Sequence, residues 1–189
     1  MKKFILLALL LTAFLMQSCI ITQEYTIHNN MSGSQRFEMD YSAISTIVGE
    51  KADSLTQQVD SLFNSTFATN ETIEGLSNYK YGSENGKYFL SFDFENAETN
   101  EIGVKFTKNG NKISLNFDKI QEFFATMNDK EESKDMDMSS MFQYTAIFNF
   151  DKKVASVTGV DAEITGKKTV KVPIKINSFP KGEVVITLK

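Results

Sequence analysis

Residues 102–117 read Ile-Gly-Val-Lys-Phe-Thr-Lys-Asn-Gly-Asn-Lys-Ile-Ser-Leu-Asn-Phe. Apolar side chains recur at every second position on both sides of Asn109-Gly110: Ile102, Val104 and Phe106 before it, and Ile113, Leu115 and Phe117 after it. A period of two is typical of a strand with one buried and one wet face. Asn-Gly supplies the positive φ that a tight turn requires. The stretch therefore predicts a β-hairpin within an antiparallel sheet.

Similar alternation continues along much of the chain. Further strands are expected at 21–27, 36–41, 73–81, 87–94, 146–150, 154–157, 160–164, 169–176 and 184–188. Turn-forming residues at 29–33 and at Gly166-Lys167 separate neighbouring strands. Pro173 has no N–H to donate to a ladder, so it predicts an edge position for its strand.

Two segments show helical periodicity instead. The first carries apolar residues at spacings of three and four, and a coiled-coil partner face is the alternative to packing on a sheet: Ile44, Val48, Ala52, Leu55, Val59 and Leu62. In the second, Asp118 and Gln121 resemble a capping box ahead of an apolar face formed by Ile120, Phe123, Phe124 and Met127. The expected fold class is α+β: a twisted antiparallel sheet, open or curled into a half-barrel, with two helices packed on one face.

The chain begins with the three parts of a secretory signal. Lys2-Lys3 is followed by an apolar run at 4–16 and then by Gln17-Ser18-Cys19. The run is shorter than the roughly 20 residues that span a bilayer. Met16 fits poorly at an A-x-A cleavage site. A run of this kind ending at a cysteine resembles the leader of small Bacteroidetes-type lipoproteins of unknown function.

This resemblance implies a signal peptide at 1–18, a single envelope domain at 19–189 and a lipidated Cys19. A lipoprotein cysteine carries a diacylglyceryl thioether and a further N-acyl chain such as palmitate, and two chains already give stable anchoring. The position after the cysteine is Ile20 rather than the Asp of inner-membrane retention, which favours the outer membrane. No acidic run follows Cys19, which favours the periplasmic side.

Composition narrows the function classes. The net charge is −4, and residues 19–189 sum to −6 once Lys2 and Lys3 are removed with the leader. Basic residues occur at most in pairs, so we expect no nucleic-acid partner. Cys19 is the only cysteine, which excludes an intramolecular disulfide.

No pattern in the chain predicts catalysis, a metal or a cofactor. His28 is the only histidine and no Gly-x-Ser-x-Gly elbow occurs, so we expect a surface or turn histidine. Asp135-x-Asp137-x-Ser139 begins like a calcium loop, but Ser140 and Ala146 occupy the positions that need Gly and Glu. We therefore predict no catalytic residues and no metal site.

One modification signal is present. Asp53-Ser54-Leu55 and Asp60-Ser61-Leu62 both resemble the acceptor of Bacteroidetes O-glycosylation. The two serines are seven residues apart, so they share one face of the expected helix. Ser54 and Ser61 are candidate glycosylation sites, and coincidence in a serine-rich helix is the alternative.

Three functions remain open. The first is a non-enzymatic binding or scaffolding module of the envelope, in which a sheet face or the 128–137 segment contacts a protein partner. The second is a carrier of a lipid or other apolar ligand in a Phe-lined cavity, against which a close-packed core competes. The third is a hydrolase that uses acidic residues.

Overall fold

The computed structural model describes residues 19–40, 74–84, 87–99, 103–122, 142–159, 161–175 and 183–189. These residues form eleven strands in two sheets. The strands are β1 (Cys19–Ile27), β2 (Gly33–Asp40), β3 (Leu76–Glu84), β4 (Lys87–Phe94), β5 (Lys105–Asn109), β6 (Lys112–Asn116), β7 (Phe142–Phe150), β8 (Val154–Thr158), β9 (Glu163–Ile164), β10 (Thr169–Lys175) and β11 (Val184–Leu188).

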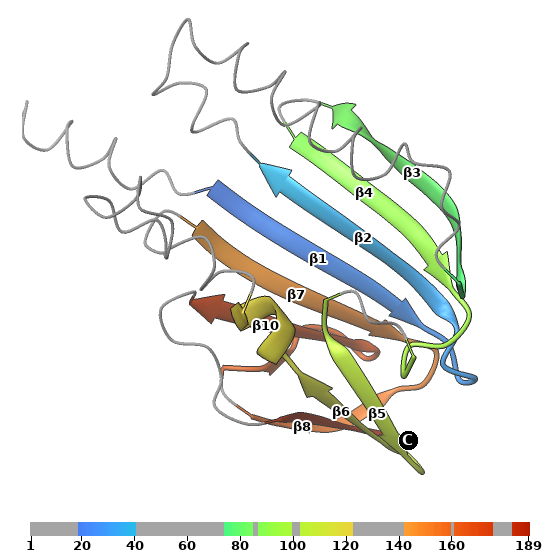
Figure 1. Ribbon diagram of the computed structural model, residues 1–189. Coiled ribbons are helices and arrows are strands. Elements are labelled where there is room, and N and C mark those ends of the chain that lie inside the picture. The colour runs from blue at the N-terminus through green and yellow to red at the C-terminus, as the bar shows by residue number, and fades with distance from the viewer. Residues whose placement is uncertain are drawn as a thin grey trace, which may run out of the picture.

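The larger sheet has seven strands in the order β3-β4-β2-β1-β7-β10-β9, and the smaller has four in the order β5-β6-β11-β8. β1 and β7 run parallel at the centre of the larger sheet, and its other neighbours are antiparallel. The smaller sheet lies against the β7 and β10 side, whereas β2, β4 and β3 extend beyond it (Figure 1). The described fold is therefore two layers of unequal width.

The predicted α+β fold class is wrong for the described residues. Strands make up 67% of them and helix 5%, and no helix reaches seven residues. The first expected helix lies outside the described residues. Of the second, only 118–122 is described, and it forms a short helical segment. The apolar face that the prediction covered with helices is covered, over β1, β7 and β10, by a second sheet. Alternation along β5, β6, β8 and β11 gave no sign that these strands leave the first sheet.

Most strand positions were predicted correctly. β4 and β11 match their expected spans, and the expected hairpin at residues 102–117 is β5–β6. Asn109 pairs with Lys112 across a two-residue turn in which Gly110 has φ +62°. Pro173 lies on β10 beyond the two residues that pair with β9, so among the described strands this part of β10 is an edge, as expected.

The inner face of the larger sheet is built from alternate residues. β1 contributes Ile21, Gln23, Tyr25 and Ile27, all buried, while Glu24 and the other intervening side chains point outward. β7 and β10 repeat the pattern with the buried side chains Tyr144, Ala146, Phe148, Phe150, Val170, Val172 and Ile174. This alternation explains why the period of two was visible in the sequence.

Tyr25 occupies the centre of the packing between the sheets. Its ring stacks on Phe148 at 5.1 Å and meets Phe106 edge to face at 5.2 Å. Its hydroxyl accepts a hydrogen bond from Val104 N at 3.0 Å, and burial raises the pKa of this phenol. A Cβ on Gly103, where φ is +86°, would lie 2.6 Å from the Tyr25 hydroxyl, so only glycine permits this close approach.

We predict that Tyr25→Phe lowers the free energy of unfolding by about 1–3 kcal/mol, because it leaves the buried Val104 N–H without its acceptor. Tyr81→Phe is the matched control at a 39% exposed tyrosine, and its expected change is within about 0.5 kcal/mol. Urea unfolding of the unlipidated chain measures both. Equal effects of the two substitutions would show that the Tyr25 hydroxyl does not join the sheets.

Candidate functional site

Cys19 is the first residue of β1. It lies opposite Phe142 on β7, and Ile20 lies opposite both Gln143 on β7 and Asp40 on β2. The predicted lipid-bearing residue therefore stands at one end of the central strand, paired with β7, and the next residue is paired on both sides. Nothing in the described ranges forms a helix long and apolar enough to cross a membrane.

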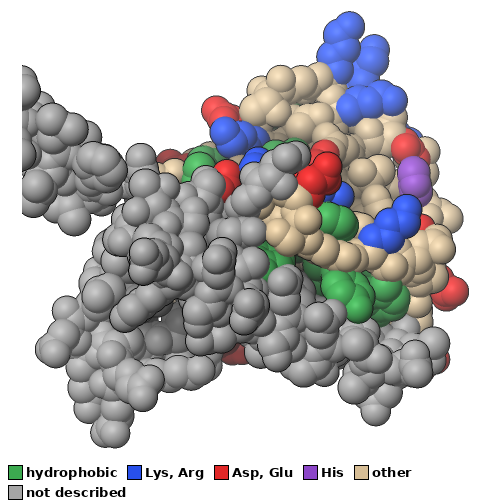
Figure 2. All heavy atoms as spheres, turned by 90° about the horizontal axis from the view of Figure 1, so that it is seen from above, with side chains coloured by type: hydrophobic (Ala, Val, Ile, Leu, Met, Phe, Trp, Pro, Cys, Tyr) green, Lys and Arg blue, Asp and Glu red, His purple; other side chains and the backbone are tan. Residues whose placement is uncertain are grey.

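His28 lies at the other end of β1. Its Nδ1 is 3.2 Å from each carboxylate oxygen of Asp151, and Asn29 N donates to Asp151 Oδ2 at 3.1 Å. The His28 side chain is half exposed, which confirms the predicted surface histidine. Figure 2 shows the histidine at the surface among acidic and basic side chains. The pair joins the turn after β1 to the turn after β7.

The electrostatics of this pair follow from its hydrogen bonds. The His28 hydrogen bond, followed by the Asn29 N–H, holds the pKa of Asp151 below its ordinary value. Within the described ranges, the His28 ring is hydrogen-bonded to the Asp151 carboxylate. No hydroxyl nucleophile in these ranges is hydrogen-bonded to the ring. The arrangement resembles two members of a hydrolytic triad without the third.

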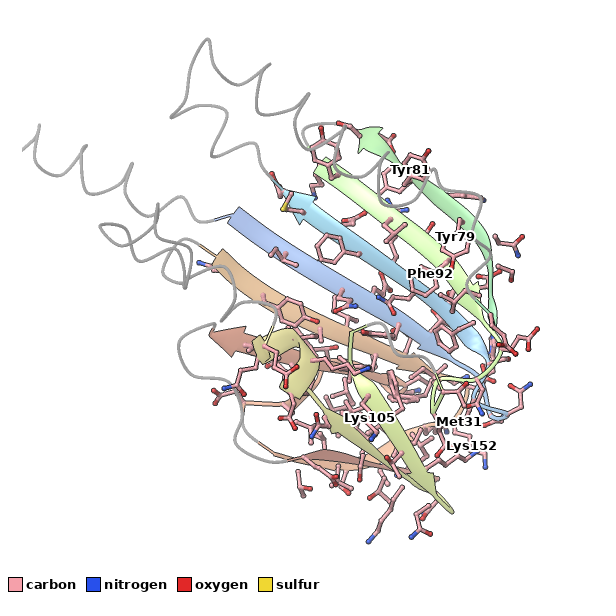
Figure 3. The ribbon with its side chains drawn as sticks, in the orientation of Figure 1. Met31, Tyr79, Tyr81, Phe92, Lys105 and Lys152 are labelled. Carbon is pink, nitrogen blue, oxygen red and sulfur yellow. The ribbon has the colours of Figure 1, made fainter. Side chains whose placement is uncertain are left out.

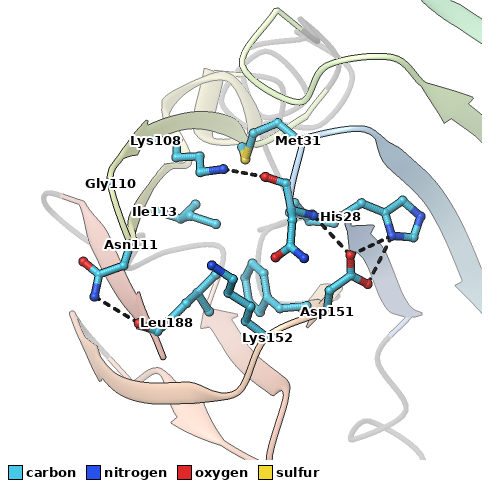
Figure 4. Close-up of a pocket in the computed structure, with 12 residues that line it drawn as sticks. His28, Met31, Lys108, Gly110, Asn111, Ile113, Asp151, Lys152 and Leu188 are labelled. Atoms are coloured by element: carbon cyan, nitrogen blue, oxygen red, sulfur yellow. Dashed lines mark hydrogen bonds and ion pairs between the residues drawn. The ribbon is translucent and has the colours of Figure 1, made fainter.

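A small pocket lies beside the pair (Figure 4). Its volume is about 60 Å³, and Lys108 Nζ crosses it to donate to Asn29 O at 2.5 Å. The lining residues are Ile27, His28, Asn29, Met31, Lys108, Gly110, Asn111, Ile113, Phe150, Asp151, Lys152 and Leu188. Pockets for organic ligands occupy about 300–1,000 Å³. This one has room for a few water molecules.

A wider hollow of about 230 Å³ lies on the outer face of the larger sheet, lined by Arg36, Glu38, Glu84, Lys87 and Phe89. Arg36 NH2 is 2.7 Å from Glu38 Oε1, and its guanidinium lies 4.7 Å from the centre of the Phe89 ring. Two cations and two carboxylates line the hollow, so it presents no excess charge to a ligand.

The inner face of β2, β4 and β3 carries two buried polar atoms that have no hydrogen-bond partner within the described part of the chain. They are Gln35 Oε1, on a side chain only 2% exposed, and the Tyr79 hydroxyl. Gln35 lies opposite Phe92 across β2 and β4, and the Tyr79 ring is 5.7 Å from the Phe92 ring. Both residues are thus neighbours of Phe92, and Figure 3 shows Tyr79 beside Phe92. Buried polar atoms without a hydrogen-bond partner are rare in folded proteins, so each of these two calls for an explanation.

Sequence reasoning missed these polar positions, although a signal existed. Gln23 and Gln35 occupy inward positions in alternating strands, where an apolar residue is the norm. Gln23 has a partner, because Tyr144 OH donates to its Oε1. Gln35 Oε1 has none. The sequence could show that an amide was placed inside, but not whether another side chain reached it.

Several sequence candidates lie outside the described residues: Ser54, Ser61, the calcium-like stretch at 135–139 and the 128–137 segment. Among the residues that are described, no three His, Cys, Asp or Glu side chains are grouped so that they could hold a metal ion.

Comparison with known proteins assigns no family to this chain. No family model matches the chain, and no curated protein matches it. A solved structure that is similar is the NMR structure of the folded domain of the LppM protein of Mycobacterium tuberculosis, at 12% identity and a TM-score of 0.46 over 92% of this chain and 91% of that chain. A similarity at this level carries no argument about function, so the lipoprotein interpretation depends on the leader.

Lowering the pH should remove the stabilisation that Asp151 provides. Because the folded-state pKa is lowered, this stabilisation is complete above the ordinary value of 3.8 and is lost as the pH falls through the lowered value. The free energy of unfolding should therefore fall more steeply for the wild type than for Asp151→Asn on going from about pH 5 to pH 2. In a His28→Ala background the difference in slope between proteins with and without Asp151→Asn should shrink, because the hydrogen bond that most lowers the Asp151 pKa is absent. Parallel slopes in the wild type, Asp151→Asn, His28→Ala and the double variant would exclude the His28–Asp151 bond as a contributor to stability.

Proposed function

We propose that this chain is an envelope lipoprotein of the Bacteroidetes type, held at the periplasmic side of the outer membrane by lipid on Cys19, and that its domain is a non-enzymatic binding module. One observation carries the proposal: residues 1–18 have the layout of a signal peptide that ends immediately before a cysteine. Cys19 and Ile20 are themselves paired within the larger sheet. Cleavage before Cys19 would leave every described strand intact.

The outer face of the larger sheet is the surface that we propose for a protein partner. Parallel strands are usually covered on both faces, yet the outer face of β1 and β7 is mostly polar, with Ile20 and Ile147 as its apolar members. Asn149 Nδ2 donates to Glu24 Oε1 at 2.7 Å across the two strands, and Thr22 and Thr145 lie opposite each other. This face offers hydrogen-bonding groups in fixed positions, which suits a polar protein contact.

The non-enzymatic part of the proposal is supported by the surroundings of His28. Within the described ranges no hydroxyl nucleophile is hydrogen-bonded to its ring, and the adjoining pocket has a volume of only about 60 Å³.

Replacing Cys19 by Ala should abolish lipidation. The wild-type chain is expected in the membrane fraction with the mass of residues 19–189 plus a diacylglyceryl group and an N-acyl chain. Cys19→Ala should lack the added mass and should not yield the lipoprotein form. Intact-mass spectrometry of both proteins, purified from a Bacteroidetes-type host, measures this. A wild-type protein that ends at another residue or carries no lipid would overturn the proposal.

A second candidate function, a carrier of an amphipathic ligand, is favoured by the unpartnered Gln35 Oε1 and Tyr79 hydroxyl. The surrounding side chains of β2 and β4, such as Phe37, Leu90 and Phe92, are apolar, and no charged side chain of these strands shares the face. Burying an uncompensated charge is costly, so the ligand would have an apolar body and a neutral hydroxyl or amide.

Tyr79→Phe separates this carrier function from simple core packing. Without ligand, removing an unpartnered hydroxyl should leave stability equal or slightly higher, whereas affinity for monooleoylglycerol should fall about three- to tenfold through one lost hydrogen bond. Tyr81→Phe, two residues along β3, is the matched control and should bind like the wild type. Titration calorimetry and urea unfolding measure the two properties. If Tyr79→Phe destabilises the ligand-free protein, a bound water rather than a ligand occupies the site.

A further inference from the structure

We propose that the Cys19 end of the larger sheet docks directly against lipid headgroups, so that β1 stands away from the membrane and the His28–Asp151 end points outward. This inference rests on the proposed lipidation of Cys19 and adds the orientation and the contact surface of the domain. Its partner is a lipid bilayer.

No flexible linker separates Cys19 from the sheet. A lipid-bearing cysteine followed by a flexible segment lets a domain diffuse freely above the bilayer. Here Cys19 itself is opposite Phe142, and Ile20 is paired on both sides, with Asp40 and Gln143. The chain cannot extend away from Cys19 without breaking pairs at the centre of the sheet. The lipid is therefore attached to a fixed point of the fold.

β1 runs from the Cys19 end of the sheet to the pocket end. The strand runs over nine residues from Cys19 to Ile27, and its parallel partner β7 runs from Phe142 to Phe150. At about 3.3 Å per residue, these strands separate their two ends by roughly 26 Å. Both begin at the Cys19 end and finish beside the pocket lined by Ile27 and Phe150. When the Cys19 end contacts lipid, the pocket end lies far from it.

The side chains at the Cys19 end suit contact with lipid headgroups. Ile20 is a large apolar side chain that is 46% exposed there, where contact with a lipid interface would cover it. The charged residues that the described strands bring to this end are Asp40 and Glu84 together with Lys87 and Lys175, and their charges sum to zero. Lys87 Nζ lies 3.9 Å from Asp40 Oδ2. A described surface without net charge is neither repelled by anionic lipid nor dependent on it. We expect docking to be insensitive to salt.

The test uses the full lipidated protein in phosphatidylcholine–phosphatidylethanolamine vesicles that contain a headgroup-nitroxide lipid. Gln143→Cys and Lys152→Cys place a bimane label at exposed positions beside the two ends of β7, and Cys19 does not react because its sulfur is in the thioether. Quenching should be roughly threefold or more stronger at residue 143 than at residue 152, because the ends lie about 26 Å apart. Intact mass establishes lipidation of each sample.

A control variant carries about ten Gly and Ser residues between Cys19 and Ile20, which restores a flexible linker. In this variant the ratio should fall towards one. Equal quenching at both positions of the wild-type protein, or stronger quenching at residue 152, would overturn the docking proposal while leaving lipidation intact. Absence of the lipid mass would instead overturn the proposed function. A ratio that the linker does not change would show that the missing linker is not the cause, and would also overturn the proposal.

Discussion

The parallel pairing of β1 with β7 is the constraint on which the rest of the described structure depends. It joins the first described strand to one more than a hundred residues later in the chain, from Cys19 opposite Phe142 to Ile27 opposite Phe150. β2 and β4 extend the sheet on one side, and β10 extends it on the other. Long-range pairing of this kind closes a large loop before it gains any contact, so we expect the central strands to form late in folding.

Tyr25 connects this pair to the second layer. Its ring lies between Phe148 of the larger sheet and Phe106 of the smaller, and its hydroxyl accepts from Val104 N. One side chain thus provides apolar contact and a polar bond in the same interface. A phenylalanine could supply the packing but not the acceptor, which explains why a tyrosine occupies the most buried position of β1.

The same strand also relates the candidate sites to one another. Its first residue is the proposed lipid anchor, its inner face carries Gln23 and Tyr25, and its last residues border the His28–Asp151 pair. A sheet is stiff along its strands, so a lipid anchor at the Cys19 end would fix the distance between the membrane and the His28–Asp151 pair at the other end. In this arrangement a partner would approach the far end or the outer face rather than the lipid-bearing end.

The sequence by itself determined the positions of most strands and the turn at Gly110, because these depend on a period of two and a positive φ, and it correctly assigned His28 to the surface. The leader at residues 1–18 and the lipidation of Cys19 are predictions that depend on local composition alone. Only the tertiary structure decided that the strands form two sheets, that β1 pairs with β7, that Asp151 is the partner of His28 and that Gln35 Oε1 has none. Alternation reveals that a face is buried but not what covers it. Pairing between distant strands is decided by side chains that meet only after folding, which is why one sheet with two helices was an equally consistent solution of the same pattern.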